Sequence, residues 1–525
     1  MPSYCLLLFL LVATISILEP PLAESFQWDL PISSLRWPKC QICLQAKKQS
    51  PDAVAKRGNR NSSSFQKWKK LNQEIMRLPK SENVLEFFMA KGGITADSPF
   101  NHVNYCTMLH RIAKMASYWD KDERVQPSDK IASVSSDPRF ALLLSCIGEK
   151  LSRDDDKFGS RDMASLMWGL AKLKITSTRH SSFAENEQFA DGQTVQRNLR
   201  KSLGVTDIEH LETPSSALKR DLVKAAHDEE YKKGIGWMHS QRELGSSIID
   251  ALSTLVVERV DFLNPQELAN CLWAYSTVGR LDEKFMEAVL PKLTACDLYY
   301  YNSESNTRNA IKPQELSNSI WALSAVKYRS IQQKDFLHFV ARSLEEGDFS
   351  SQFKPQELSN ICWGIAKLRK KRIDERENCF GLDGGEVGEV EEGGSGEEDE
   401  LEDNNIRRIL RVAMRLFNVQ QAKPQEVTNM VWSLATVGWN TMGGDEEETD
   451  TKMCDDFCKL VATSRAQTLG RSGFTSQEMN NLAWSFAKLN YEGEGMIELF
   501  NAIASQFKKK TDQFSTLDMS VISWR

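Results

Sequence analysis

The chain repeats one short phrase, and each clear copy ends at a tryptophan. The best copies read KPQELSNSIW at 312–321 and KPQELSNICW at 354–363. Seven copies end at Trp168, Trp273, Trp321, Trp363, Trp432, Trp484 and Trp524. An eighth, degenerate copy lies at 100–115, with His110 in place of the tryptophan. Repetition at this period predicts stacked structural units.

Each copy has the features of a helix start. Pro265, Pro313, Pro355 and Pro424 stand where the missing N–H costs little. An acid two residues later, such as Glu267, favours the positive end of a helix. Counted from the proline as position 1, positions 4, 7, 8, 11, 12 and 14 hold mostly apolar or small residues. They cover more than half of the helix, which therefore needs neighbours on several sides.

A second amphipathic segment follows each central copy. These segments are 285–293, 336–344, 406–417, 457–469 and 496–507. Trp321 and Trp363 are 42 residues apart, and Trp484 and Trp524 are 40 apart. We therefore predict an all-α fold, an α-solenoid of stacked antiparallel helix pairs of about 40 residues. No sustained β pattern indicates a sheet domain, although 174–245 is too mixed to exclude a small one.

Composition sets the predicted boundaries outside the central repeats. Residues 6–18 form an apolar run followed by two prolines, which predicts a cleaved signal peptide at 1–25. Ten Lys or Arg against two acids in 26–70 indicate a basic transit-like segment at 26–75. The other expected parts are degenerate N-terminal repeats at 76–173, an insertion at 174–245, and helical-pair repeats at 246–525, the last one incomplete.

A signal peptide followed by a transit segment predicts delivery to a plastid, into the chloroplast stroma. Residues 23–26 also resemble the alanine–phenylalanine cleavage motif of algae with secondary plastids, which implies Phe26 as the new N-terminus. The mitochondrial matrix is the alternative destination. We expect no stable membrane association once the signal peptide is removed.

The net charge of −6 argues at first against a nucleic-acid partner. Residues 383–403, however, contain eleven acids and no base, and 445–450 contain five more acids. Without these segments the repeats and the N-terminal segment are positive. Their composition predicts acidic disordered inserts at 380–404 and 443–451. The inserts are either solvated loops or mimics of a polyanion that suppress non-specific binding.

The eleven cysteines do not form a recognisable metal or disulfide pattern. Cys271 and Cys362 fall on the apolar face of repeat helices, where a free cysteine acts as a small hydrophobe. Cys454 and Cys458 are one helical turn apart, and the CxxC at 40–43 has no second pair at zinc-site spacing. We expect a reducing compartment, no metal and no cofactor.

The recurring phrase PQELxNxxWxxAxL, once per helical pair, resembles the octotricopeptide-like repeats of algal and protist organelle proteins. It is more distantly similar to the helical repeats of FASTK and RAP-domain proteins. The degenerate copy at 100–115 looks like the opening repeat of such chains, so the resemblance covers 80–525 apart from the insertions. No C-terminal RAP domain is recognisable, so nuclease activity assigned to that domain is not carried over.

The resemblance implies an RNA-binding factor of plastids or mitochondria. Such factors act in transcript stability, processing, splicing, ribosomal RNA maturation or translation. The implied partner is single-stranded organellar RNA, together with proteins of ribonucleoprotein or processing complexes.

Positions 2, 6, 10 and 13 of the first helix align along one face and form a polar stripe. Position 6 is occupied by Asn270, Asn318, Asn360, Asn429 and Asn481, and position 2 of the same copies by glutamine. Residues that do not vary between copies cannot carry a base code. They form either hydrogen-bonded ladders between repeats or uniform contacts to RNA.

Basic residues supply the candidate phosphate contacts. Position 13 holds Lys172, Lys367 and Lys488 in three copies, which either follow a phosphate backbone or favour the negative helix end. The densest basic run is Lys367, Arg369, Lys370, Lys371 and Arg372. It either binds phosphate or pairs with the acidic insert that follows. The motif tryptophans are interpreted as packing residues in preference to base-stacking platforms.

Two other classes of function were weighed. Stacked helical pairs also bind peptides, so a protein–protein adaptor without nucleic-acid binding is the alternative. An enzyme is not expected, because the sequence has no P-loop, Rossmann glycine fingerprint, HExxH motif or nucleophile elbow. It also has no kinase motifs, and its seven histidines lack metal-ligand spacing.

Overall fold

The computed structural model describes residues 63–95, 97–118, 126–153, 157–175, 236–280, 283–301, 307–325, 331–381, 395–439, 447–470 and 473–509. The predicted signal peptide, most of the predicted insertion at 174–245, the CxxC at 40–43 and Trp524 lie outside these residues.

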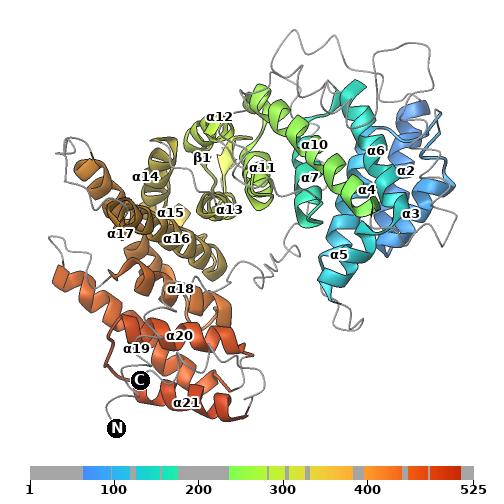
Figure 1. The fold of residues 1–525 in the computed structure, drawn as a ribbon. Helices are drawn as coiled ribbons and strands as arrows, with labels where there is room; N and C mark the ends of the chain where they lie inside the picture. Colours follow the sequence, from blue (N-terminus) through green and yellow to red (C-terminus); the bar gives the residue numbers. More distant parts are fainter. Residues whose placement is uncertain are drawn as a thin grey trace. The chain divides into compact units, whose positions relative to one another are not determined.

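Helices make up almost all of the regular structure described, as the repeat pattern predicts (Figure 1). The helices before the central copies are α2 (Ser63–Arg77), α3 (Ser81–Ala90), α4 (His102–Ala116), α5 (Pro127–Ser135), α6 (Pro138–Arg153), α7 (Ser160–Lys172), α10 (Gly236–Glu258) and η7 (Val260–Phe262). The later helices are α11 (Pro265–Thr277), α12 (Glu283–Thr294), α13 (Pro313–Ser324), α14 (Ile331–Glu345), α15 (Gly347–Ser350), α16 (Pro355–Gly381), α17 (Ser395–Leu416), α18 (Pro424–Val437), α19 (Glu447–Thr468), α20 (Ser476–Lys488) and α21 (Met496–Lys509). Strands β1 (Asp297–Leu298) and β2 (Ala310–Ile311) form one short parallel pair.

The predicted helix starts are confirmed, since α11, α13, α16 and α18 begin at their prolines. The acid at position 3 does more than favour the helix dipole. Its carboxylate accepts a hydrogen bond from the N–H of the residue before the helix, at 2.9 Å for Glu267 and 2.7 Å for Glu315. Asp162 in α7 and Glu478 in α20 make the same bond, at 3.1 and 2.7 Å. Asn104 makes it with its amide oxygen in α4, at 3.2 Å.

The helices pack in two series that follow the chain (Figure 1). In the first series, which contains the motif helices, each member contacts the next: α4, α7, α11, α13, α16, α18 and α20. The second series behaves in the same way: α6, α10, α12, α14, α17, α19 and α21. Five members of the second series are the amphipathic segments predicted from the sequence. One hydrophobic core extends between residues 71 and 503 and joins the two series.

Position 10 of the motif helix corrects the predicted polar stripe. It holds Gly169, Ala274, Ala322, Gly364, Ser433 and Ser485, all of which are buried. A methyl group added to Gly364 would lie 2.7 Å from the Ile320 Cγ2 atom of the preceding motif helix. Small residues at this position therefore let neighbouring helices approach closely. The polar and aromatic residues of the motif instead align through positions 2, 6, 9 and 13.

Four predicted segments overlap helices of the structure. The transit-like segment overlaps α2, whose Leu71 and Ile75 belong to the core. The insertion at 174–245 overlaps α10, which begins at residue 236. The acidic inserts at 380–404 and 443–451 overlap α17 and α19, which begin at residues 395 and 447. Acids at these helix starts are ordered because arginines pair with them, as described below.

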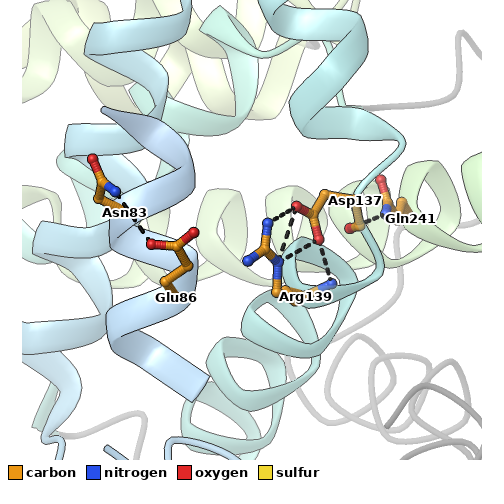
Figure 2. A network of polar contacts seen from close by, with 5 residues as sticks. All are labelled: Asn83, Glu86, Asp137, Arg139 and Gln241. Carbon is orange, nitrogen blue, oxygen red and sulfur yellow. Dashed lines mark hydrogen bonds and ion pairs between the residues drawn. The ribbon is translucent and has the colours of Figure 1, made fainter. Parts of the chain in front are cut away.

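Figure 2 shows the hydrogen bonds near Asp137, one of which joins α10 to the start of α6. The Asp137 carboxylate accepts the backbone N–H of Arg139 at 2.9 Å and also binds its guanidinium, with Nη2 to Oδ2 at 2.6 Å. The Asp137 carbonyl accepts a hydrogen bond of 3.2 Å from Gln241 Nε2 in α10. Within α3, Asn83 Nδ2 donates to Glu86 Oε2 at 3.2 Å. One residue therefore starts α6 and binds a helix more than 100 positions later in the chain.

The cap at Glu315 predicts a pH-dependent stability. Burial raises the pKa of Glu315 to about 7, although Lys312 opposes this shift. Because the folded-state pKa exceeds the unfolded value, stabilisation by the bound proton is complete below the unfolded pKa and is lost as pH rises through about 7.

Glu315→Gln keeps an oxygen acceptor for the Lys312 N–H but cannot ionise. The stability of the wild type relative to this variant should fall by at most about 3 kcal/mol from pH ~5 to ~8. Thermal unfolding across this range measures it, and parallel pH profiles would contradict it.

Candidate functional site

Motif aromatic rings form a row along the first series of helices. His110 of α4 stacks on Trp168 of α7 with ring centroids 4.7 Å apart. Trp273 and Trp321 are 6.0 Å apart, and Trp363 and Trp432 are 6.4 Å apart. Trp273 is buried, whereas Trp168, Trp321, Trp363, Trp432 and Trp484 are half-buried. The rings contribute to packing, as predicted, and also keep part of their surface open to solvent.

The lysines at position 13 lie beside these rings. Lys172 Nζ is 5.9 Å from the Trp168 ring centroid and 5.1 Å from that of Trp273 on the next motif helix. Lys367 Nζ lies 5.8 Å from the Trp363 centroid, and Lys488 Nζ lies 5.1 Å from the Trp484 centroid. Three lysines therefore lie beside aromatic rings on one face. We name it the motif face and define it by positions 2, 6, 9 and 13 of the first-series helices.

The degenerate first copy also belongs to the motif face. Counted from His102, position 9 is His110 and position 13 is Lys114, a lysine that the sequence reasoning missed. An alignment of this copy with the others places Lys114 at position 13 and would have identified it. Burial, with the charges of Lys114, Arg161 and Arg111, lowers the pKa of His110 to about 4. The imidazole is therefore neutral at pH 7 and takes the place of the tryptophan as an uncharged ring.

The asparagines of position 6 do not form the predicted ladder. Among the described residues, no hydrogen bond joins the side chain of Asn270, Asn318, Asn360, Asn429 or Asn481 to another repeat. Asn360 and Asn429 are buried, at 5% and 4% exposure, and the other three are half-buried. Polar groups at this depth normally have partners.

The basic run at the end of the α16 motif divides into two groups. Arg369, Lys371 and Arg372 are used within the protein. Arg369 Nε donates to Asp403 Oδ1 at 3.1 Å and Nη1 donates to the Val437 carbonyl at 2.7 Å. Lys371 Nζ donates to the Ser324 carbonyl at 2.7 Å, at the end of α13.

Arg372 has the most buried side chain of this group, with 3% exposure. It binds Asp403, and its Nη1 lies 3.6 Å from Glu402 Oε2, whose side chain is also 3% exposed. Burial alone raises the pKa of Asp403, but hydrogen bonds and charges from Arg369 and Arg372 outweigh it and hold the pKa below the usual value. Pairing with the acidic segment, the second interpretation of this basic run, therefore describes these two arginines, because residues of α17 bind them.

The second predicted insert is held in a similar way. Asp450 of α19 accepts two hydrogen bonds of 2.8 Å from Arg411 of α17, and its carbonyl accepts the Trp439 Nε1 proton at 3.1 Å. Of the predicted basic run, Lys367 and Lys370 remain on the motif face, at positions 13 and 16 of α16. Lys370 is exposed.

Metal and membrane sites find no support in the described residues. Within the ranges given above, no three His, Cys, Asp or Glu side chains come together as metal ligands would. None of the described helices combines the length and apolar character needed to cross a bilayer. Cys271 and Cys362 are fully buried as predicted, and burial raises the pKa of both thiols. They act as core residues.

The arginine–acid cluster predicts contrasting effects for two neighbours. Arg372→Ala leaves Glu402 and Asp403 without their buried cation and should lower the free energy of unfolding by about 3–5 kcal/mol. Lys370→Ala removes an exposed side chain and should change it by less than about 0.5 kcal/mol. Chemical denaturation of both variants measures the difference. Equal stabilities would show that the cluster does not hold α17.

Comparison with known proteins identifies no relative of this chain. The chain matches no protein-family model, and no curated protein matches it. Its resemblance to octotricopeptide-like repeats therefore rests on the recurring phrase and its spacing alone.

Proposed function

We propose that this protein is a helical-repeat protein that binds single-stranded RNA in an organelle and acts in the processing, stability or translation of its transcripts or ribosomal RNA. The two series of helices then form an α-solenoid of helix pairs related to the octotricopeptide-like repeats. The protein has no catalytic centre in this proposal. Its contribution is to hold RNA, alone or within a processing complex.

The observation that carries the proposal is the composition of the motif face. Aromatic rings recur at position 9 of successive helices, asparagines recur at position 6 of the central copies, and lysines lie beside the rings of α7, α16 and α20. These are the three groups that single-stranded RNA engages: its bases stack, its phosphates attract cations, and its base edges exchange hydrogen bonds. Their presence on one face favours RNA over a peptide partner, for which cations beside aromatic rings have no general use.

Position 13 is the part of the motif face that differs between copies. It holds lysine in α4, α7, α16 and α20, threonine in α11 and α18, and alanine in α13. Glutamine or asparagine at positions 2 and 6 of the central copies hardly varies. Uniform positions therefore supply affinity for any sequence, while position 13 changes the charge along the face.

The proposal predicts salt-dependent binding. A double variant, Lys172→Gln with Lys367→Gln, should bind a mixed pool of RNAs of about 20 nucleotides less tightly than the wild type. The slope of log affinity against log salt should shrink by about 0.7 for each lysine lost. Fluorescence anisotropy from about 50 to about 300 mM KCl measures both quantities. The matched control is Lys452→Gln, an exposed lysine of α19 in the second series.

Two results would count against RNA binding in this experiment. Wild-type protein that is folded and shows no binding at low salt would leave the protein–protein adaptor as the better function. An equal loss in the Lys452→Gln control would show that the RNA is held by net charge and not by the motif face.

The destination proposed is the plastid stroma, with the mitochondrial matrix as the alternative. A fusion of residues 1–75 to a fluorescent protein should accumulate in plastids of an alga with secondary plastids. The mature protein isolated from the organelle should begin at Phe26, which N-terminal sequencing determines. Accumulation in mitochondria would reassign the organelle without changing the argument for RNA.

A further inference from the structure

Helix α2 takes the place of a motif helix before α4, although it has no copy of the recurring phrase. Side chains of α4 bind it near both ends. Asn104 Nδ2 donates to the Trp68 carbonyl at 3.1 Å and to Asn72 Oδ1 at 3.3 Å. Arg111 Nη2 donates to the carbonyl of Leu78, the residue after α2, at 2.6 Å. Because these contacts advance along both helices together, α2 and α4 run in the same direction.

Consecutive motif helices are related in this way. Ile320 of α13 packs against Gly364 of α16, and further along both helices the Ser324 carbonyl accepts a hydrogen bond from Lys371. Helix α3 has the corresponding position in the second series, because it contacts α6 and packs into the common core. Helices α2 and α3 therefore form one more helix pair ahead of the degenerate copy at 100–115.

Contacts and burial place α2 in phase with the motif. In α13 the residue that faces the next motif helix is Ile320, at position 8. In α2 the side that faces α4 carries Asn72, which binds that helix, and Ile75, which is fully buried. These two residues are about one helical turn apart and match positions 5 and 8. The residues at positions 2, 6 and 9 of the motif face are then Lys69, Gln73 and Met76.

Position 10 provides a check on this alignment. In α7 and α16 it is a buried glycine, because the preceding helix packs against it. In α2 it is Arg77, which is exposed, as expected of the first helix in the described part of the series. Position 4, which is apolar in most copies, is the buried Leu71. Helix α2 escaped the sequence pattern because proline, glutamate and tryptophan are absent from its positions 1, 3 and 9.

The side of α2 that continues the motif face is exposed and positive. Lys69 is exposed, and Met76 is 52% exposed. Lys69 has no ion pair among the described residues, whereas Glu74, the acid of α2, lies 3.7 Å from Lys91. A terminal helix that only protects the end of a repeat stack needs a polar outer surface. That role does not explain an exposed methionine together with the 36% exposed Trp68.

Lys69, Gln73 and Met76 reproduce the chemistry of the motif face. The lysine supplies a cation for a phosphate, and the glutamine supplies an amide at the position of the central asparagines. The thioether of Met76 makes favourable contacts with aromatic rings, so a base can lie against it as against a tryptophan. Positive charge without a paired acid also suits a polyanion better than an apolar partner.

We propose that α2 is a cryptic motif helix whose Lys69, Gln73 and Met76 extend the motif face by one helix toward the N terminus and bind single-stranded RNA there. This role rests on the RNA-binding function proposed above and specifies where the bound strand continues. It assigns to the binding surface a segment that composition placed in the predicted transit-like region. Cleavage before Phe26, as predicted, leaves α2 in the mature chain.

The test uses the full chain with Lys69→Gln and Met76→Ala combined. The matched control combines Lys70→Gln and Arg77→Gln, at exposed positions 3 and 10 of the same helix, outside the motif face. The control loses more positive charge than the test variant, so an effect of net charge alone would be larger in the control. Binding of a fluorescein-labelled RNA pool of about 20 nucleotides is followed by anisotropy in increasing KCl. Thermal unfolding establishes that both variants are folded, and their midpoints should equal that of the wild type because the changed side chains are exposed.

The expected result is roughly fivefold weaker binding at low salt and a slope smaller by about 0.7 for the Lys69/Met76 variant, with at most about a twofold loss in the control. Wild-type affinity and slope in the Lys69/Met76 variant would overturn the extension and leave RNA binding by the other motif helices intact. An equal or larger loss in the control would also overturn it, because net charge would then hold the RNA.

Two further outcomes separate this proposal from its alternatives. No binding by the folded wild type would overturn both the extension and the proposed function. Sedimentation that shows self-association of the wild type, and its loss in the Lys69/Met76 variant at unchanged RNA affinity, would overturn the extension and assign this side of α2 to a second copy of the chain.

Discussion

The side-chain cap at the start of each motif helix is the interaction on which the rest of the structure depends. A side-chain oxygen at position 3 binds the N–H of the residue before the helix, and this occurs in α4, α7, α11, α13, α16, α18 and α20. The bond satisfies one of the backbone donors that every helix start leaves open, and it fixes the first residue of the helix. Every later position then points in the same direction in every copy.

A common start explains why different properties gather on different faces. Small residues at position 10 meet the preceding helix, as Gly364 meets Ile320, so consecutive motif helices approach closely. Positions 9 and 13 are one helical turn apart and so share a side of the helix, where they bring Trp168, Lys172 and Trp273 together across two helices. The motif face is thus a consequence of helix phase and does not require special loops. RNA binding, as proposed, uses a surface that the packing of the repeats creates.

The acidic segments have a structural part that composition conceals. Eleven acids in 383–403 suggest a disordered loop, yet Glu402 and Asp403 lie within α17 and pair with Arg369 and Arg372. Asp450 holds the start of α19 to Arg411 in the same manner. Within the densest basic run, Arg369 and Arg372 are therefore paired with acids, whereas Lys370 is exposed. The acids therefore determine which basic residues stay exposed on the surface, because an arginine that is paired with an acid is no longer available to a ligand.

The sequence alone determined the all-helical fold class, the starts of the motif helices and the segments of the second series, because proline, acid and apolar periodicity are local properties of the chain. It also identified Lys172, Lys367 and Lys488, whose position follows from helix phase. It could not decide that Arg372 is buried while Lys370 is exposed, or that the asparagines of position 6 lack a ladder. Those outcomes depend on contacts between helices far apart in the sequence, and only the tertiary structure brings such partners together.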